Sequence, residues 1–336
     1  MGSQELVVLA QRLEAIPQLA VFKGVRLAEK TRFGIGGPAD LYLETPCEDS
    51  LIEALRLLDR EAVAWAILGG GTNVVVADEG FRGAVMRFTG AAIEREGCAL
   101  VVEAGAELQA VVDRANAEGL QGLETLAGIP GTAGGAVYGN AGAYGHCISE
   151  CVREVRFWEG ERVRCLPAEQ CAFDYRESIF KRRPRWVILR ARLEMRPGDP
   201  VELARRSAEL IALRVQKYPP EMKCAGSIFK NLVYDRLPPR ARASVPVQVV
   251  REGKAPAAWF LEQVGAKGMR RGDICVASYH ANLIYNAGAG TARDLCELIA
   301  ELKRRVRERF ELELEEEIRF LAPAPPTAAT SSLCPA

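Results

Sequence analysis

The chain has 336 residues, with 44 basic side chains against 44 acidic ones and two histidines. A formal charge of zero argues against a nucleic-acid-binding protein, which needs a basic face, and the hydrophobic content of 49% is that of a globular chain. The length suggests about two domains, and the one anomaly of composition is glycine, with 31 residues.

The N-terminal segment predicts a helix within residues 1–21, because apolar residues recur there at helical spacing. It lacks the basic, apolar and small-residue regions of a signal peptide, and the sequence has no run of about 18 apolar residues. We therefore expect a cytoplasmic, monomeric protein that has neither a membrane nor a nucleic acid as its partner.

The ten cysteines include no Cys-x-x-Cys pair, and with only two histidines the sequence has no spacing typical of a zinc site. We expect no bound metal. Most of the cysteines are interpreted as small buried hydrophobic residues in a reducing compartment.

Strand and helix patterns alternate through the first two thirds of the chain. Apolar runs predict strands at residues 63–68, 74–76, 84–88, 100–103, 152–158 and 187–195. Apolar stripes predict helices at residues 108–117, 201–217 and 291–310, the last of them capped by Thr291. The Pro/Gly-rich residues 196–200 are the best candidate for a linker, residues 237–251 resemble a surface insertion, and residues 322–336 resemble a disordered tail. The mixture indicates an α+β fold with a boundary near residue 197.

The glycines gather in two places. Gly69, Gly70 and Gly71 precede Thr72 and Asn73, and nine more glycines lie between residues 119 and 145. Glycine-rich turns beside strands bring backbone N–H groups close to a diphosphate, because no Cβ intervenes. Neither Gly-x-Gly-x-x-Gly nor a P-loop motif is present, so the pattern indicates a dinucleotide or diphosphate site of another type. The alternative is that these glycines serve only tight turns in a β-rich region.

Seven motifs follow one another in a fixed order, at residues 31–39, 68–78, 127–145, 173–181, 225–231, 280–286 and 314–319. Together they resemble the MurB family of UDP-N-acetylenolpyruvoylglucosamine reductases, over residues 20–321. The short interval between residues 176 and 227 resembles the type II subgroup, which lacks an extra substrate loop.

The resemblance implies an α+β fold, with a two-lobed FAD-binding domain of the vanillyl-alcohol-oxidase (PCMH) type and a C-terminal α+β substrate-binding domain. The implied domains are an N-terminal helix at 1–21, an FAD-binding domain at 22–197 divided near residues 90–100, a substrate-binding domain at 198–321 and a tail at 322–336. FAD would be bound non-covalently, and NADPH would be the co-substrate. The residues implied to line FAD are Gly69, Gly70, Gly71, Thr72, Asn73, Gly128, Ile129, Pro130, Gly131, Gly134, Gly135, Asn140, Ala141 and Gly142.

The family reaction reduces UDP-N-acetylglucosamine enolpyruvate to UDP-N-acetylmuramate, with hydride added at C3 and a proton at C2. The resemblance implies that Arg176 stabilises charge at the substrate carboxylate, that Ser227 gives the proton and that Glu317 assists at the enolate. Alternation along residues 312–320 instead places Glu316 on the apolar face, so periodicity and motif favour different glutamates. The implied substrate contacts are Tyr175, Lys230 and Asn231.

Two other functions stay open at this point. An FAD-dependent oxidase or dehydrogenase of the same fold would share the glycine segments but would not require Arg176, Ser227 and Glu317 together. A regulator that binds a nucleotide sugar but has no catalytic activity would not need these three residues either.

Overall fold

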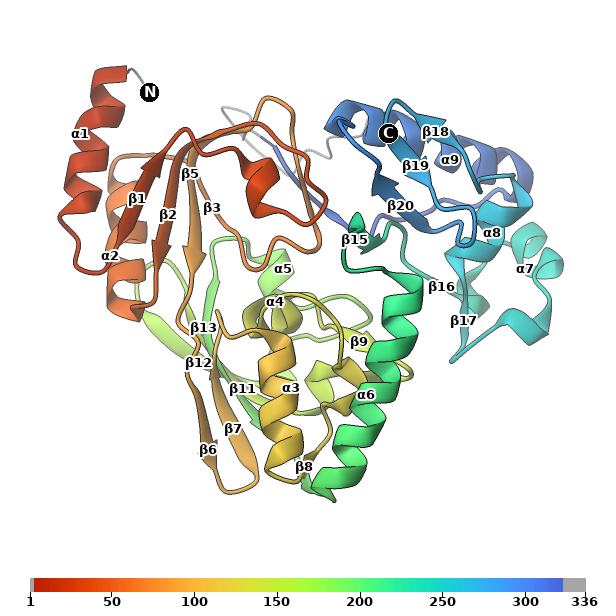
Figure 1. Cartoon of the computed structure of the whole chain (residues 1–336), viewed down its shortest axis with the longest axis horizontal. Coiled ribbons are helices and arrows are strands. Elements are labelled where there is room, and N and C mark those ends of the chain that lie inside the picture. Colours follow the sequence, from red (N-terminus) through yellow and green to blue (C-terminus); the bar gives the residue numbers. More distant parts are fainter. Residues whose placement is uncertain (1–2, 323–336) are drawn as a thin grey trace. The chain divides into compact units, whose positions relative to one another are not determined.

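The computed structural model describes residues 3–322 and divides into two compact units, labelled by element in Figure 1. Unit 1 runs to Val25 and then comprises Ala39–Gly70 and Gly83–Pro220. Unit 2 comprises Arg26–Pro38, Gly71–Arg82 and the chain from Glu221 onward. Each unit has its own buried hydrophobic cluster.

Unit 1 is built on two sheets. The first has the order β1-β2-β5-β3, with β1 antiparallel to β2 and β3 parallel to β5. The second is antiparallel, in the order β12-β11-β13-β7-β6. The strands of the two sheets are β1 (Ala20–Lys23), β2 (Ala39–Thr45), β3 (Trp65–Ile67), β5 (Phe81–Phe88), β6 (Ile93–Glu96), β7 (Ala99–Glu103), β11 (Val152–Trp158), β12 (Val163–Pro167) and β13 (Val187–Glu194). Two-residue strands form the additional pairs β8 (Leu120–Gln121) with β14 (Arg196–Pro197) and β9 (Gly142–Ala143) with β10 (His146–Cys147).

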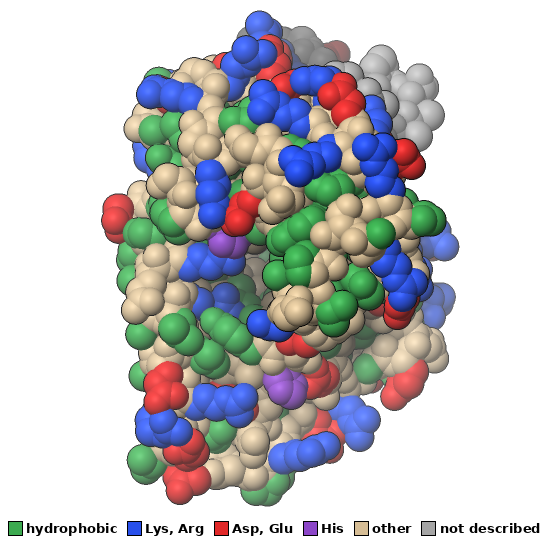
Figure 2. All heavy atoms as spheres, turned by 90° about the vertical axis from the view of Figure 1, so that its right-hand side faces the viewer, with side chains coloured by type: hydrophobic (Ala, Val, Ile, Leu, Met, Phe, Trp, Pro, Cys, Tyr) green, Lys and Arg blue, Asp and Glu red, His purple; other side chains and the backbone are tan. Residues whose placement is uncertain are grey.

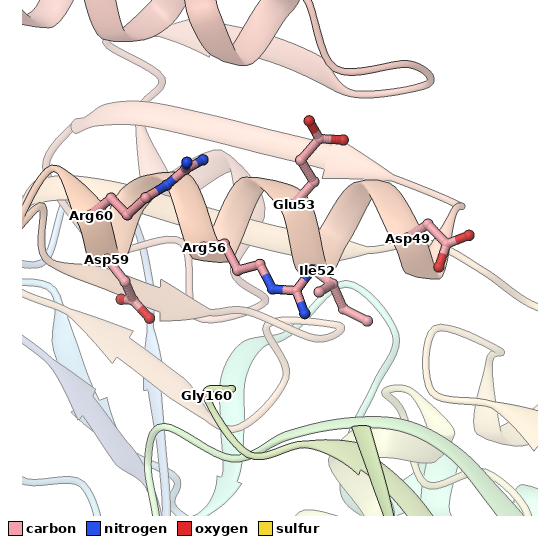
Figure 3. A pocket seen from close by; sticks show the side chains of 7 residues that line it. All are labelled: Asp49, Ile52, Glu53, Arg56, Asp59, Arg60 and Gly160. Atoms are coloured by element: carbon pink, nitrogen blue, oxygen red, sulfur yellow. The ribbon is translucent and has the colours of Figure 1, made fainter. Parts of the chain in front are cut away.

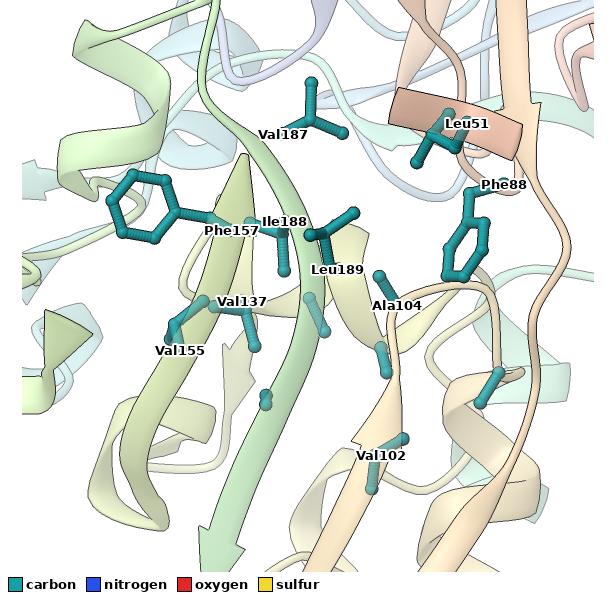
Figure 4. Packing of buried hydrophobic residues seen from close by; sticks show 14 of the residues in the cluster. Leu51, Phe88, Val102, Ala104, Val137, Val155, Phe157, Val187, Ile188 and Leu189 are labelled. Atoms are coloured by element: carbon teal, nitrogen blue, oxygen red, sulfur yellow. The ribbon is translucent and has the colours of Figure 1, made fainter. Parts of the chain in front are cut away.

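One hydrophobic cluster spans both sheets of unit 1. Figure 4 shows Leu51 and Phe88 near the first sheet packed in the same cluster as Val102, Val155 and Leu189. The chain passes from the first sheet to the second between β5 and β6, which is where the sequence predicted a division. The shared cluster makes the two sheets parts of one compact unit.

The helices of unit 1 bury apolar stripes. In α2, Leu51, Leu55 and Leu58 recur at helical spacing and are fully buried. Asp199 caps α6 by accepting a hydrogen bond from the N–H of Val201 at 2.8 Å, and proline occupies the first helical position. The helices are α1 (Ser3–Glu14), α2 (Glu48–Arg60), α3 (Leu108–Ala117), α4 (Ala133–Tyr138), α5 (Ile179–Arg182) and α6 (Pro200–Lys217).

Helix α6 corrects the predicted boundary. The sequence placed residues 198–321 in the second domain, but α6 packs against α3 within unit 1, as Figure 1 shows. The buried Asn116 of α3 donates a hydrogen bond to Ser207 of α6 at 2.8 Å. The division comes after this helix, at Pro220, because the Pro/Gly-rich residues 196–200 form a turn inside unit 1 rather than a linker.

Unit 2 has an antiparallel sheet in the order β15-β20-β19-β18. Its longest helix, α9, buries Leu295, Ile299, Leu302 and Val306 on one face, and Thr291 caps it as the sequence predicted. The elements from Glu221 onward are β15 (Lys223–Ser227), β16 (Leu232–Val233), α7 (Pro239–Ser244), β17 (Lys254–Ala255), α8 (Ala257–Gln263), β18 (Arg270–Arg271), β19 (Ile274–Val276), β20 (Leu283–Asn286), α9 (Ala292–Phe310) and β21 (Arg319–Leu321). Residues predicted as an insertion form α7 and the loop after it, and the predicted tail from residue 323 lies outside the described residues.

Two N-terminal segments belong to unit 2, which corrects the contiguous 22–197 domain. Strand β4 (Val74–Val76) runs parallel to β21, and Phe33 and Val75 are fully buried in the unit 2 cluster. Asp78 accepts hydrogen bonds from the N–H groups of Ala292 and Arg293 at 2.8 and 3.0 Å, so it caps α9 together with Thr291. Residues 74–78 of this motif therefore also have a structural role, because they bind β21 and the start of α9 within unit 2.

The face in Figure 2 carries Lys and Arg side chains interspersed with Asp and Glu, in keeping with the zero net charge. None of the helices in residues 3–322 is long and apolar enough to cross a membrane.

Candidate functional site

The two glycine-rich segments meet within unit 1. Gly69 and Gly70 follow β3, and a Cβ at Gly70 would lie 2.9 Å from the Cα of Gly131. A Cβ at Gly69 would lie 2.9 Å from the hydroxyl oxygen of Thr132. Real Cβ atoms do not approach other heavy atoms this closely, so the lack of side chains permits the two segments to pack together.

The loop before α4 is held by α3 and by its own cap. Gly128 donates its N–H to the side-chain oxygen of Gln109 at 2.7 Å, and the carbonyl of Gly131 accepts from the N–H of Leu108 at 3.0 Å. Thr132 caps α4 through the N–H of Gly135 at 3.2 Å, and the N–H of Gly134 bonds to the carbonyl of Ala104 at 2.9 Å. The loop backbone is therefore fixed in place, with Ile129 half-buried and Pro130 exposed.

Gly135 is a glycine that the fold itself does not require. It is exposed in α4, and a Cβ there would meet only the hydroxyl oxygen of Thr132, at an ordinary 3.4 Å. Helix interiors disfavour glycine by roughly 0.5–1 kcal/mol relative to alanine. The space above Gly135 is thus available to a group from outside the chain, which fits the FAD-lining role predicted from the sequence.

We expect Gly135→Ala to separate folding from cofactor binding. The apoprotein should be unchanged or more stable by up to about 1 kcal/mol, because alanine favours a helix. FAD affinity should fall by about tenfold to a hundredfold, because the methyl group would crowd the cofactor. Denaturant unfolding of the apoprotein and fluorescence titration with FAD measure the two effects.

Gly139→Ala is the matched control, because a Cβ there meets only the carbonyl oxygen of Gly135 at 3.5 Å and the residue is not a predicted cofactor contact. Equal FAD affinity in the two variants would contradict the assignment of Gly135.

The second part of the glycine-rich segment is tied to the arginine motif. Asn140 is buried with a left-handed φ of 43°, and its amide donates to the carbonyl of Asp174 at 2.9 Å. Ala141 connects it to Gly142 in β9, whose carbonyl accepts a hydrogen bond from the guanidinium of Arg176 at 2.9 Å. Unit 1 therefore brings predicted cofactor residues and one predicted catalytic residue together.

Arg176 occupies a tight turn. Asp174 and Glu177 exchange backbone hydrogen bonds of 3.1 and 3.0 Å, and Arg176 between them has a φ of 58°. The ring of Tyr175 lies 5.3 Å from its guanidinium carbon. The turn projects a planar cationic fork, which suits a carboxylate.

The sequence missed Arg214 of α6. Its guanidinium donates to the carbonyl of Ala127 at 2.8 Å and lies over the ring of Tyr144 at 5.4 Å. Burial lowers the pKa of the Arg214 guanidinium, and the charge of Arg176 acts in the same direction. The sequence did contain a signal for Arg214. It lies three residues after Ile211 and therefore on the same face of α6, and Ile211 packs against the unit 1 cluster.

The rest of the first glycine segment belongs to unit 2. Gly71 has a φ of 64°, and a Cβ there would overlap the carbonyl oxygen of Lys30. Half-buried Thr72 precedes Asn73, whose side chain donates to the carbonyl of Glu317 at 3.1 Å. The N–H of Arg319 in turn donates to the carbonyl of Asn73 at 3.0 Å, which joins this segment to β21.

Ser227 ends β15 directly after a β-bulge. The register passes from Cys224 opposite Tyr285 to Ser227 opposite Leu283, so β15 has one extra residue, and Gly226 has a φ of 76°. A bulge re-aims the side chain that follows it. The buried Asn282 then holds the next peptide groups by accepting from the N–H of Phe229 at 2.9 Å and donating to its carbonyl at 2.8 Å.

Glu317 lies beside the serine segment. Its N–H donates to the carbonyl of Ile228 at 2.7 Å, so the residues after Ser227 and those around Glu317 form adjacent backbone segments. Glu316, which periodicity favoured, instead accepts a hydrogen bond from the ammonium of Lys303 on α9 at 3.1 Å. The ion pair accounts for a half-buried carboxylate at residue 316.

Two predicted substrate residues have partners inside unit 2. Lys230, whose side chain is 11% exposed, forms an ion pair with Glu315. The exposed Asn231 accepts a hydrogen bond from the N–H of Ala257 at 3.2 Å, at the start of α8.

A separate surface hollow of about 730 Å³ lies along α2 (Figure 3). Arg56 points toward the loop of Gly160 and bonds to the carbonyl of Glu161 at 3.3 Å. The residues that line the hollow all lie outside the predicted site; they are Asp49, Ile52, Glu53, Arg56, Asp59, Arg60 and Gly160. In residues 3–322, no group of three or more His, Cys, Asp or Glu side chains is arranged to hold a metal ion.

Two family models match the chain. A model described as an FAD binding domain matches residues 39–165, and the C-terminal domain of UDP-N-acetylenolpyruvoylglucosamine reductase matches residues 218–321. The second match begins close to the division that the structure shows at Pro220. The predicted α+β fold class, with an FAD-binding domain and a C-terminal domain of this family, is confirmed.

Full-length relatives agree with these models. A UDP-N-acetylenolpyruvoylglucosamine reductase of Solibacter usitatus is 58% identical over 92% of this chain and 99% of its own length. The corresponding protein of Rubrobacter xylanophilus is 40% identical over 88% of this chain and 93% of its own. The crystal structure of MurB from Thermus caldophilus matches with a TM-score of 0.71 and 32% identity, over 90% of this chain and 99% of that one. The chain belongs to the MurB family of UDP-N-acetylenolpyruvoylglucosamine reductases.

Proposed function

We propose that this chain uses NADPH and non-covalently bound FAD to reduce UDP-N-acetylglucosamine enolpyruvate to UDP-N-acetylmuramate, a precursor of peptidoglycan. The observation that carries the proposal is the pairing in unit 2 of the Ser227 segment with the Glu317 segment, through the 2.7 Å bond from Glu317 N–H to Ile228 carbonyl. An FAD-binding fold alone would not require this pair. The reductase is therefore favoured over an oxidase of the same fold or a regulator without chemistry.

The residues of the glycine segments fit FAD. The close approach of Gly70 to Gly131, the fixed loop before α4 and the open space above Gly135 together suit a bound dinucleotide. Gly69 to Asn73, Gly128 to Gly135 and Asn140 to Gly142 would hold the cofactor, mainly through backbone groups. When bound, FAD supplies the hydride chemistry of the reaction.

Arg176 is proposed to bind the carboxylate of the enolpyruvyl group. Hydride addition at C3 places negative charge on C2 and, by conjugation, on that carboxylate. A guanidinium held in a fixed turn stabilises the negatively charged transition state, and it does not have to reorganise during the reaction. Its bond to the Gly142 carbonyl restricts the side chain in advance.

Ser227 is proposed to donate the proton that C2 receives. A serine hydroxyl is a weak acid, so its proton must be replaced by a neighbour or by water. The β-bulge at Gly226 and the Asn282 bonds fix the backbone on both sides of Ser227. Glu317 is proposed to assist at the enolate, next to this segment, as a protonated or hydrogen-bonded carboxyl group.

The purified protein tests this function directly. We expect it to contain FAD and to be yellow. In the absence of oxygen, it should oxidise NADPH continuously only when UDP-N-acetylglucosamine enolpyruvate is present, with one NADPH consumed for each substrate molecule reduced. A colourless protein that takes up no added FAD, or NADPH consumption indifferent to this substrate, would contradict the proposal.

Several finer assignments stay predictions. Tyr175, Lys230 and Asn231 are the predicted substrate contacts, and for Lys230 the ion pair with Glu315 would have to open or be shared. The cytoplasmic location and the monomeric state likewise stay predictions.

A further inference from the structure

The turn that presents Arg176 adopts a conformation that its sequence does not favour. Tyr175 and Arg176 are the central residues between Asp174 and Glu177, and Arg176 has a φ of 58°. The second central position of a tight turn with positive φ is ordinarily glycine or asparagine. An arginine there persists only where surrounding groups hold the backbone.

Lys181 supplies such a hold from α5. Its ammonium donates to the carbonyl oxygen of Arg176 at 2.7 Å and to the carboxylate of Glu177 at 2.9 Å, and its side chain is only 12% exposed. The carbonyl bond restrains the peptide group that follows the strained φ of Arg176. Charge-assisted hydrogen bonds of this kind are stronger than neutral ones.

Helix α5 is itself firmly anchored, so the ammonium is not a mobile surface charge. The buried Ser178 donates to the carbonyl of Tyr138 at 2.7 Å and caps α5, and Phe180 is fully buried in the unit 1 cluster. Arg182, the next residue along the helix, is exposed. The structure therefore distinguishes two neighbouring cations, of which only Lys181 reaches the turn.

We infer that Lys181 is a positioning residue for the reduction of substrate, acting through Arg176. Its ammonium holds the Arg176 carbonyl at one end, while the Gly142 carbonyl holds the guanidinium at 2.9 Å at the other. Restraint at both ends sets the direction of the guanidinium before a substrate carboxylate arrives. This inference rests on the proposed function, because it presumes that Arg176 binds that carboxylate.

The test measures the two half-reactions of the FAD-loaded enzyme separately, by anaerobic rapid mixing. In Lys181→Met, the rate at which saturating UDP-N-acetylglucosamine enolpyruvate reoxidises the reduced flavin should fall about tenfold to a hundredfold. Reduction of the flavin by NADPH should stay within about twofold of the wild-type rate, because NADPH has no enolpyruvyl carboxylate for Arg176 to bind. Lys181→Gln retains a neutral donor and should recover part of the loss, and Arg182→Met should behave as the wild type.

A double-mutant cycle with Arg176→Ala separates positioning from general stabilisation of the fold. In the Arg176→Ala background, Lys181→Met should slow reoxidation by less than about twofold further, since no guanidinium remains to be aimed. A full additional loss in that background, or a normal Lys181→Met enzyme beside an impaired Arg176→Ala enzyme, would overturn the inference alone. A normal Arg176→Ala enzyme would overturn the proposed role of Arg176 and the inference with it. If Lys181→Met does not fold, Lys181→Gln is used in the same cycle.

Discussion

Ser227→Ala should nearly abolish formation of UDP-N-acetylmuramate while leaving flavin reduction by NADPH close to normal. Removing a general acid costs about 10²–10⁴-fold in the step that it serves. The substitution deletes one hydroxyl and keeps the bulge at Gly226 and the Asn282 bonds, so the backbone should not move. Anaerobic rapid-mixing measurements of the two half-reactions check the result.

Ser244→Ala serves as the control for this variant, because Ser244 is exposed at the end of α7 in the same unit. It should be indistinguishable from the wild type in both half-reactions. If Ser227→Ala slowed both half-reactions to the same extent, Ser227 would not be the proton donor.

Glu317→Gln should lower the rate of substrate reduction by about 10²–10³-fold, because an amide cannot supply the proton with which a carboxyl group would assist at the enolate. Glutamine has nearly the same shape and keeps the backbone bonds to Ile228 and Asn73, since these come from the main chain of Glu317. FAD content and thermal stability should therefore be unchanged. Steady-state kinetics with saturating NADPH provide the measurement.

Glu316→Gln is the matched comparison, one residue away. It should retain activity and lose at most about 1 kcal/mol of unfolding free energy, since its carboxylate forms a partly exposed ion pair with Lys303. The opposite pattern, with activity lost in Glu316→Gln and kept in Glu317→Gln, would reverse the assignment and favour the residue that alternation along residues 312–320 had indicated.

Sequence patterns within short segments predicted the helices and turns that neighbouring residues specify. The stripe from Leu295 to Phe310 with Thr291 before it predicted α9 to within a residue, because helical spacing and a cap are properties of a short segment. The two glycine groups predicted a shared site, and the structure brings Gly70 against Gly131. The seven ordered motifs identified the family, which the relatives confirm.

Local signals did not reveal which core each segment joins. Phe33 and Val75 look like the other apolar residues of the first domain, yet they are buried in unit 2, and α6 looks like the start of the second domain, yet it packs on α3. Periodicity reports which face of an element is apolar and not which distant surface covers it. The two compact units differ from the predicted contiguous domains for this reason.

The sequence by itself determined the family, the fold class and the residue types available for chemistry. Only the tertiary structure decided that Glu316 pairs with Lys303, that Arg214 reaches the Ala127 carbonyl and that Lys181 restrains the turn of Arg176. Each of these depends on a hydrogen bond to a group whose position is set by the packing of other elements or by an unusual backbone angle. Such contacts have no periodic signature, because long-range packing selects the partner.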